Sequence, residues 1–418
     1  MPLSPCCGPA KSHSDMKPLN LALPLAIAAA LAGCGGSDTS TGTMRLSLTD
    51  APACGYDNVW VTVEKVRVHQ SGGAGDNDAG WAEVVLPTPQ RIDLLTLTNG
   101  TLLPLGQTEL PAGTYTQMRL VLGNAPPPGS PAGTLANSIK PTGATQETEL
   151  TTPSGQQSGL KMNVSLDVPA GQVADFAIDF DACKSFVKSG SSGKYLLKPV
   201  LSVIPILSTA GQRVVGYVDP AIALSSTTVS VQVGGEPAKA TAPGANGSFV
   251  LYPVPVGNYD LVVTAAGRVT AVMTGVPVTA TAVTTVNALA TAITPPATVL
   301  APRAVTGTVA PASATVRARQ TLSGGPTVEI AWAAVDSVSG AFAFTLPIEA
   351  PVRTTYVANP PTLTLTPDTL ALGLYTIQAR SADLTLAQDI DTKAAVPPLT
   401  FTFPPSEGVD SRSRVQRL

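Results

Sequence analysis

The segment VWVTVEKVRV, residues Val59–Val68, alternates apolar and polar side chains along its length. Successive side chains of a β-strand point to opposite faces, so this pattern predicts a strand with one buried and one solvated face. Such alternation is typical of antiparallel sheets. The segment is long enough for one strand or for a bent pair, and it predicts a β-protein.

Five further segments between residues 43 and 207 are candidate strands: Met44–Leu48, Met118–Leu122, Leu160–Leu166, Phe176–Phe180 and Tyr195–Ile206. Turn-rich stretches separate them, at Ser71–Gly80 and at Asn124–Gly159. The second stretch is rich in Pro, Gly and Thr, and we expect it to be a surface excursion. Residues 43–207 are therefore expected to form one β-domain.

Two later units repeat the motif order Gly-x-Val, Gly-x-Phe and Gly-x-Tyr. The motifs begin at Gly216, Gly247 and Gly257 in one unit and at Gly307, Gly340 and Gly373 in the other. Glycine suits tight turns with positive φ, and aromatic rings at strand starts can fill a sandwich core. The repeat predicts tandem modules with core residues Phe249, Tyr259, Phe342 and Tyr375.

The boundary between these modules is expected at Thr294–Ala297, because Pro295 and Pro296 cannot continue a central strand. We place the modules at residues 208–294 and 295–405. The polar tail 406–418 is expected to be disordered. A related fragment, Leu110–Tyr115, lies in the first domain.

Composition excludes several classes of protein. Of the 418 residues, 44% are hydrophobic and 13% are charged, which argues against wholesale disorder and predicts two to four domains. The formal net charge is −3, without a basic block, so no nucleic-acid partner is expected. Only two histidines are present, which restricts general-base and zinc chemistry.

Residues 1–33 have the pattern of a secretion signal. Lys11 and Lys17 precede Leu21–Gly33, an uncharged core too short to span a bilayer. Translation from Met1 and from Met16 are both compatible with this pattern.

The segment Leu31-Ala32-Gly33-Cys34 resembles the bacterial lipobox. The resemblance implies cleavage before Cys34, acylation of that residue and attachment to a lipid membrane, followed by a flexible tether over residues 34–42. Gly35 stands where aspartate retains lipoproteins at the inner membrane. The resemblance therefore favours the cell outer membrane, with the protein facing the periplasm or the cell surface.

Two cysteines, Cys54 and Cys183, remain after signal removal and lipidation of Cys34. In an oxidising compartment an even count favours a disulfide between them. The loop of about 130 residues would contribute roughly 4–5 kcal/mol as an upper figure. Two separate buried thiols are the alternative.

Few residues are candidates for catalysis. His69 lacks a nucleophile elbow and is expected at an exposed strand end. Asp175, Asp179 and Asp181 are explained by a wet polar strand face, with an ion site as the alternative. Asp76–Gly80 is expected to be a hairpin tip, since it lacks the third ligand and the distant glutamate of a calcium loop. We therefore assign no catalytic residue, metal ligand or cofactor.

The three tryptophans, Trp60, Trp81 and Trp332, could stack on sugar rings. A core position is the expectation for each, and Trp60 is assigned to the structural core.

Three parts of the chain resemble known families. Leu48–Pro52 followed by Val59–Val63, together with Leu110–Tyr115, Asp179–Ala182 and Leu197–Val200, resembles a bacterial lipoprotein family, domain of unknown function 4382. That family implies no activity. Residues 213–292 resemble the carboxypeptidase regulatory-like module, a transthyretin-like sandwich of seven strands, and residues 303–404 resemble it more weakly, with an insertion around Pro351–Pro367. The resemblance implies a structural or adhesive role, and some relatives bind carbohydrate.

We therefore expect an all-β chain of three antiparallel β-sandwich-like domains in tandem after a lipoprotein signal peptide. The expected role is non-enzymatic, either structural or binding, with carbohydrate or envelope proteins as partners. A carbohydrate-binding surface lipoprotein is the first alternative and requires an aromatic-lined groove. An envelope hydrolase is the second and requires a cleft with perturbed carboxylates.

Overall fold

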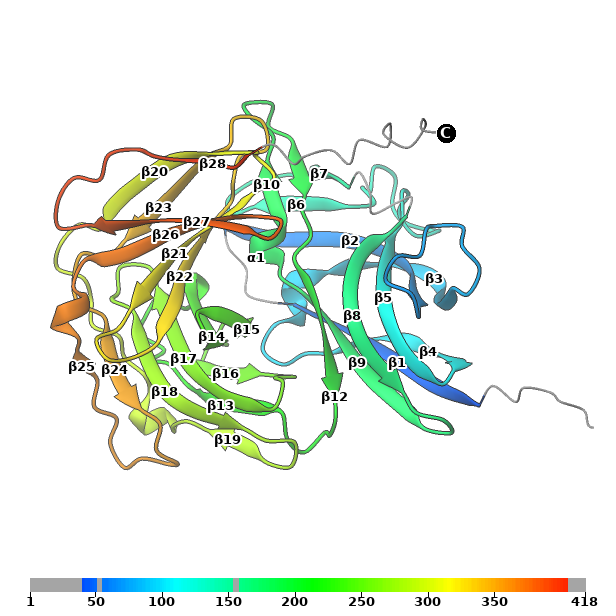
Figure 1. Cartoon of the computed structure of the whole chain (residues 1–418), viewed down its shortest axis with the longest axis horizontal. Coiled ribbons are helices and arrows are strands. Elements are labelled where there is room, and N and C mark those ends of the chain that lie inside the picture. The colour runs from blue at the N-terminus through cyan, green and yellow to red at the C-terminus, as the bar shows by residue number, and fades with distance from the viewer. Residues whose placement is uncertain (1–39, 51–54, 153–157, 405–418) are drawn as a thin grey trace, which may run out of the picture. The chain divides into compact units, whose positions relative to one another are not determined.

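A computed structural model describes residues 40–50, 55–152 and 158–404 (Figure 1). The expected signal peptide 1–33, the lipidation site Cys34, most of the tether, Cys54 and the tail 406–418 lie outside the described residues. Among the residues described, no helix is long and apolar enough to cross a membrane.

The first module is built from two sheets. One has the order β12-β9-β1-β4, with β1 Thr41–Asp50, β4 Leu103–Pro111, β9 Val173–Phe180 and β12 Leu201–Ile206. The other has the order β10-β11-β7-β6-β2-β5-β8, and β3 also pairs with β2. Its strands are β2 Tyr56–His69, β3 Ala82–Asp93, β5 Gly113–Leu122, β6 Ser138–Pro141, β7 Thr148–Thr151, β8 Leu160–Val168, β10 Phe186–Lys188 and β11 Tyr195–Leu197.

The predicted strands of this module are present, except that one of them is divided and one predicted loop contains two strands. The stretch 124–159, expected to be an excursion, contributes β6 and β7 to the larger sheet, because Thr62 of β2 binds the backbone oxygen of Ala136 and the side chain of Asn137. Tyr195–Ile206 is not one strand: β11 and β12 belong to different sheets.

The second and third modules share one topology. Each has a three-stranded sheet, β16-β13-β19 or β23-β20-β28, and a larger sheet that contains β15-β14-β17-β18 or β22-β21-β26-β27. The second module uses β13 Arg213–Tyr217, β14 Thr227–Val233, β15 Glu236–Thr241, β16 Ser248–Leu251, β17 Gly257–Ala265, β18 Ala271–Val278 and β19 Val283–Thr285. The third uses β20 Arg303–Ala310, β21 Thr315–Thr321, β22 Thr327–Ala333, β23 Ala341–Leu346, β26 Leu374–Ser381, β27 Leu384–Asp391 and β28 Leu399–Thr402.

The repeated glycines have the same structural role in both modules. Gly247 and Gly340 both have positive φ, and a Cβ there would lie 2.1 Å from the carbonyl oxygen of Val218 and 2.2 Å from that of Val309, respectively. At Gly216 and Gly307 a Cβ would instead meet the ring of Phe249 or Phe342. Only glycine permits these close approaches, which explains the repeat.

A tyrosine hydroxyl is bonded to a proline carbonyl in all three modules. Tyr115 donates to Pro111, Tyr259 to Pro255 and Tyr375 to Pro347, at 2.8–2.9 Å. In the third module 28 residues separate the partners instead of four, because an insertion lies between them. The common bond supports a relation between the Leu110–Tyr115 fragment and the two later modules.

The insertion of the third module completes the sheet of the second. Its strand β24 Val352–Thr355 pairs in parallel with β18, and β25 Thr366–Pro367 pairs with β24, seen in orange beside the green β18 in Figure 1. Val352 is buried in the core of the second module. The residues of the expected modules 208–294 and 295–405 are thus interleaved in space.

The predicted fold class, all-β with sandwich domains in tandem, is confirmed. The sheets are mixed rather than purely antiparallel, since β1–β9, β7–β11, β13–β19, β20–β28 and β18–β24 are parallel pairs. The helical elements are short: α1 Ala182–Ser185, η1 Leu94–Leu97, η2 Leu224–Ser226, η3 Leu289–Thr291 and η4 Thr369–Ala371.

Each module has its own apolar core. Phe249, Tyr259, Phe342 and Tyr375 are buried in the cores of the second and third modules, as predicted. The core position predicted for Trp60 is wrong: its neighbours Val59 and Val61 fill the core, so alternation turns Trp60 to the outer face, where it is half-buried.

Candidate functional site

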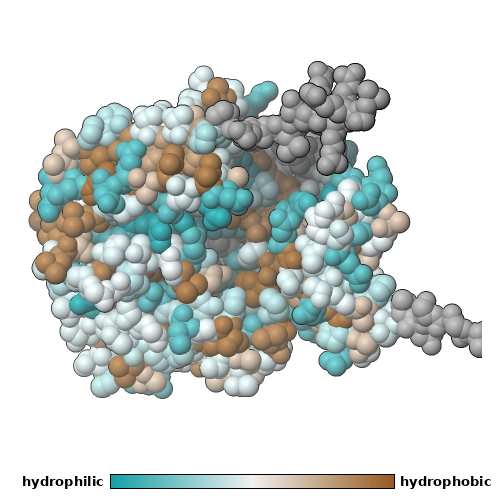
Figure 2. Space-filling model, viewed as in Figure 1, coloured by the Kyte–Doolittle hydropathy of each residue, from teal (hydrophilic) through white to brown (hydrophobic). Residues whose placement is uncertain are grey.

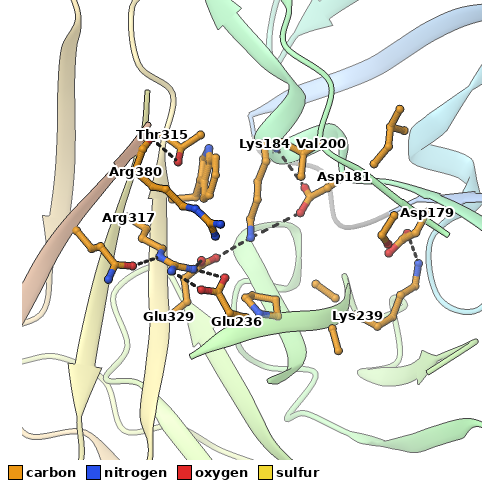
Figure 3. Close-up of a pocket in the computed structure, with 17 residues that line it drawn as sticks. Asp179, Asp181, Lys184, Val200, Glu236, Lys239, Thr315, Arg317, Glu329 and Arg380 are labelled. Atoms are coloured by element: carbon orange, nitrogen blue, oxygen red, sulfur yellow. Dashed lines mark hydrogen bonds and ion pairs between the residues drawn. The ribbon is translucent and has the colours of Figure 1, made fainter. Parts of the chain in front are cut away.

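A chamber lies where the three modules meet (Figure 3). It comprises two adjoining cavities of about 260 and 330 Å³. Side chains from all three modules line both, among them Asp181, Lys184, Glu329 and Trp332. A third cavity of about 360 Å³ is also lined by Lys184 and Trp332. This chamber is the candidate site.

The junction of the first and second modules contains a buried ion pair. Lys239 of β15 is only 1% exposed, and its Nζ lies 2.5 Å from Oδ1 of Asp179 on β9. The same Nζ donates to the Thr49 hydroxyl at 3.4 Å and to the Asp50 carbonyl at 3.3 Å. The prediction that Asp179 lies on a wet face is wrong, because the second module covers that face. Asp175 is ion-paired with Arg45 nearer the surface.

Asp50 lies behind this pair and is fully buried. Its Oδ1 accepts a hydrogen bond from the Ala182 amide at 3.0 Å, whereas Oδ2 has no hydrogen-bond partner among the described residues. Burial raises the pKa of this carboxyl well above its ordinary value, and the nearby aspartates add to the effect. Among the described residues the ion pair of Lys239 is with Asp179, and Asp50 offers Lys239 only its backbone carbonyl.

Asp181 follows β9 and caps the helix α1. Its Oδ1 accepts from the Lys184 amide at 3.1 Å, and its Oδ2 lies 3.7 Å from the Lys184 ammonium. Burial raises the pKa of Asp181 to about 6, against the opposing effect of Lys184. Asp181 therefore caps α1. It lies beyond the end of β9 and, contrary to what the sequence had suggested, does not share a strand face with Asp179.

Lys184 carries the charge network into the third module. Its Nζ lies 2.7 Å from Oε1 of Glu329 on β22. Burial alone would lower the pKa of Lys184, but Glu329 and Asp181 outweigh it, so the pKa is raised. The ammonium also lies 4.9 Å from the centre of the Trp332 ring. Lys184 therefore remains charged at neutral pH.

Arg317 of β21 continues the network to the second module. Its guanidinium binds Glu236 through two hydrogen bonds, lies 3.6 Å from Glu329, and donates to Gln378 at 2.7 Å. Burial would raise the pKa of Glu236, but the hydrogen bonds and charge of Arg317 outweigh it and lower the pKa. Alternating charges thus run from Asp181 through Lys184, Glu329 and Arg317 to Glu236.

The modules are also joined by hydrogen bonds to backbone. The Gln232 side chain accepts from the Glu329 amide at 2.7 Å and donates to the Glu329 carbonyl at 2.9 Å. A small apolar cluster of Val262, Val272, Leu322 and Val328 lies at the same contact. The third module is therefore held against the second by apolar as well as polar contacts.

The chamber meets the requirements of an enzyme only in part. Asp181 has the raised pKa of a general acid. Both of its oxygens are, however, engaged with Lys184, and every carboxylate lining the cavity has a cation close to it. No group of three His, Cys, Asp or Glu side chains that could hold a metal occurs among the described residues.

A cation lies over the ring of each tryptophan. Arg91 lies 4.4 Å from the Trp60 ring centre, and Arg67 and Arg119 lie 4.5 and 4.8 Å from that of Trp81. Lys184 lies 4.9 Å from that of Trp332, which is the tryptophan in the wall of the chamber.

The remaining candidates have structural roles. His69 ends β2, with its Nε2 2.9 Å from the Ala79 carbonyl and its Nδ1 accepting from the Ser71 amide. Asp76–Gly80 lies in the turn between β2 and β3, as predicted, and Asp76 is ion-paired with Arg119. Cys183 lies in α1 and lines the larger cavity of the chamber; its expected partner Cys54 lies outside the described residues, so the disulfide stays a prediction.

Sequence reasoning did not find Lys239, Arg317 or Glu329. Each lies in a strand, and lysine, arginine or glutamate within a strand normally indicates a solvated face. Only the contact between modules buries them. Of the residues that the sequence singled out, Asp179, Asp181 and Trp332 all line the chamber.

Comparison with known proteins gives one family match. The domain of unknown function DUF4382 is found at residues 41–199, which is less than half of the chain and covers most of the first module. The match agrees with the resemblance noted in the sequence. No curated protein matches the chain.

Solved structures give weak likenesses. Two are chains from type II cohesin–X-dockerin complexes of Acetivibrio cellulolyticus, one a C-terminal and one an N-terminal interface mutant. They are 26% and 25% identical, with TM-scores of 0.19 and 0.18, and each match covers 22% of this chain. The match spans 61% of those chains, less than two thirds of their length.

Proposed function

We propose that this chain is a non-enzymatic, lipid-anchored cell-envelope protein whose modules form one rigid unit with a structural or binding role. The buried charge network between modules carries the proposal. Lys239–Asp179, Lys184–Glu329 and Arg317–Glu236 each join two different modules. Charges used in this way fix the modules against each other, and each carboxylate that lines the chamber in the described residues is paired with a cation.

The sequence before the first strand supports anchoring. The lipobox-like segment ends at Cys34, and β1 begins at Thr41. Seven residues (41 − 34) can span at most about 25 Å at full extension. Acylation of Cys34 would therefore hold the first module close to the membrane surface, most simply the outer membrane.

Substitution of the anchor residue tests this proposal. Cys34→Ser should abolish incorporation of radiolabelled palmitate and release the protein from the membrane fraction. Protease added to intact cells should cleave the wild-type protein if it lies on the cell surface and leave it intact if it faces the periplasm. Label that enters the Cys34→Ser protein at the wild-type level would refute the anchor.

Carbohydrate binding is the second candidate, and Trp332 favours it. Its indole borders all three adjoining cavities, and the groups around it are hydroxyls and paired charges that can exchange hydrogen bonds with sugar hydroxyls. A glycan array with wild-type protein and a Trp332→Ala variant tests it: binding that needs Trp332 supports a sugar site, and no binding to any glycan refutes it.

A further inference from the structure

The strand β27 forms an open edge of the third module. It lies at the end of the sheet β22-β21-β26-β27, and among the described residues it pairs with β26 alone. Six of its eight residues are exposed, and none is buried. An edge of this kind presents unpaired backbone groups that another strand can bind.

The equivalent edge of the second module is already occupied. There β24, supplied by the insertion of the third module, pairs in parallel with β18. The Val352 amide donates to the Thr270 carbonyl at 2.8 Å, and the Tyr356 amide donates to the Thr274 carbonyl at 2.9 Å. The chain thus shows how an extended segment binds this type of edge.

The pairing registers show which residues of the two edges correspond. Ala271 is opposite Val263 in β17, and Leu386 is opposite Ala379 in β26. Val263 and Ala379 each lie four residues after the tyrosine that the two modules share, Tyr259 or Tyr375, so Ala271 corresponds to Leu386. Thr270 and Thr274, which bind β24, therefore correspond to Thr385 and Asp389, and Ala387 lies between them.

Hydrogen bonding within the third module orients the same residues outward. The Thr392 amide donates to the Gly373 carbonyl at 2.8 Å, in continuation of the β26–β27 ladder. Backbone groups of an antiparallel strand alternate in direction. The amides and carbonyls of Thr385, Ala387 and Asp389 therefore point to the open edge.

Apolar side chains beside this edge are also uncovered. In the second module Ala271 and Met273 are 2% and 3% exposed, and Leu363 and Leu365 of the insertion pack against that core. In the third module Leu384 and Leu386, which point to the same side of the strand as each other, are 50% and 36% exposed. Figure 2 shows hydrophobic residues at the surface among hydrophilic ones on the face that carries β26 and β27.

The charge of the edge determines which segment would fit. Asp383, Asp389 and Asp391 lie along or next to β27, and only Asp391 has an ion-pair partner in the described chain, Lys393 at 3.3 Å. A second copy of β27 would bring aspartates together. A basic segment would complement them.

We propose that β27 is an acceptor for an extended segment of a partner protein, which adds as a strand, with apolar residues at alternate positions and basic residues between them. This inference rests on the proposed binding role and names the chemistry of the partner. Backbone hydrogen bonds to Thr385, Ala387 and Asp389 would hold the segment, and Leu384 and Leu386 would receive its apolar side chains.

A peptide with the sequence of residues 351–357, PVRTTYV, extended by two lysines, is a suitable probe because this sequence already occupies the equivalent edge. Its binding to the full chain is measured by fluorescence anisotropy. Ala387→Pro removes one outward amide without breaking a bond to β26, and we expect about tenfold weaker binding. The control Ala387→Thr keeps the amide and should bind within about twofold of wild type.

If the Ala387→Pro variant does not fold, a charge reversal at Asp389 tests the same edge. Asp389→Lys should weaken binding of the lysine peptide and strengthen binding of a version ending in two glutamates. Equal binding to wild type and to both β27 variants would place the peptide elsewhere and overturn the proposal. A concentration-dependent dimer of the chain that Ala387→Pro abolishes would also overturn it, in favour of self-association. Neither result bears on lipid attachment, which the Cys34→Ser experiment tests separately.

Discussion

Replacing Lys239 with methionine should test how the first and second modules are joined. The ammonium of Lys239 is 1% exposed and is the ion-pair partner of Asp179, whose side chain is 9% exposed. Methionine keeps much of the side-chain volume and removes the charge. The variant therefore leaves a buried carboxylate without its cation and leaves the Thr49 and Asp50 oxygens without their donor.

The expected loss is large because removal of one partner of a buried pair leaves the other uncompensated. We expect the free energy of unfolding to fall by about 3–5 kcal/mol. Replacing both residues, Lys239→Met with Asp179→Leu, should recover most of this loss, because an apolar pair of similar volume avoids the unpaired charge. The recovery distinguishes an unpaired charge from a simple packing defect.

Urea unfolding of the full chain, followed by tryptophan fluorescence, measures these differences. Lys393→Met is the matched control, because its partner Asp391 and Lys393 itself are nearly half exposed, and the change should cost at most about 1 kcal/mol. If Lys239→Met costs no more than Lys393→Met, the junction is open to solvent and the rigid arrangement of the modules is refuted.

Three further predictions concern the modules themselves. Gly340→Ala should lower the free energy of unfolding by about 2–4 kcal/mol, because the new Cβ would meet the Val309 carbonyl. The control Gly324→Ala, at a residue with positive φ but open space around it, should lower it by about 1–2 kcal/mol. Equal melting temperatures of the two variants would contradict this. Phe249→Ala should cost about 3–5 kcal/mol in the second module, and an unchanged melt would show that its ring is not core. Burial raises the pKa of Asp181 to about 6, so between pH 3.8 and 6 the folded chain holds a proton that the unfolded chain has lost. The free energy of unfolding should therefore decrease by up to about 3 kcal/mol as the pH rises from 4 to 7. Asp181→Asn should remove this part of the pH dependence.

The disulfide prediction has its own measurement. Mass spectrometry of the unreduced chain should find the peptides containing Cys54 and Cys183 joined. Alkylation of both thiols without reduction would refute the bond.

Local features of this fold can be predicted from the amino-acid pattern alone. Alternation along Val59–Val68 was sufficient to predict β2, because the period of two follows from backbone geometry alone. The repeated glycines and aromatic residues predicted two related modules, since positive φ at Gly247 and Gly340, and the rings packed against Gly216 and Gly307, are local requirements. The buried positions of Phe249 and Phe342 followed from the same motif.

What covers each polar face depends on how the modules pack. Alternation shows that Asp179 and Phe180 point to opposite sides of β9, but both sides are buried, because Lys239 reaches Asp179 from a module that begins after it in the chain. The strand β24 lies within the third module in sequence and pairs with the second in space. These contacts join residues more than 50 positions apart, and they consist of ion pairs between buried groups and of sheet pairing, which no local pattern specifies. The charge chain from Asp181 to Glu236 therefore exists only once the modules have packed.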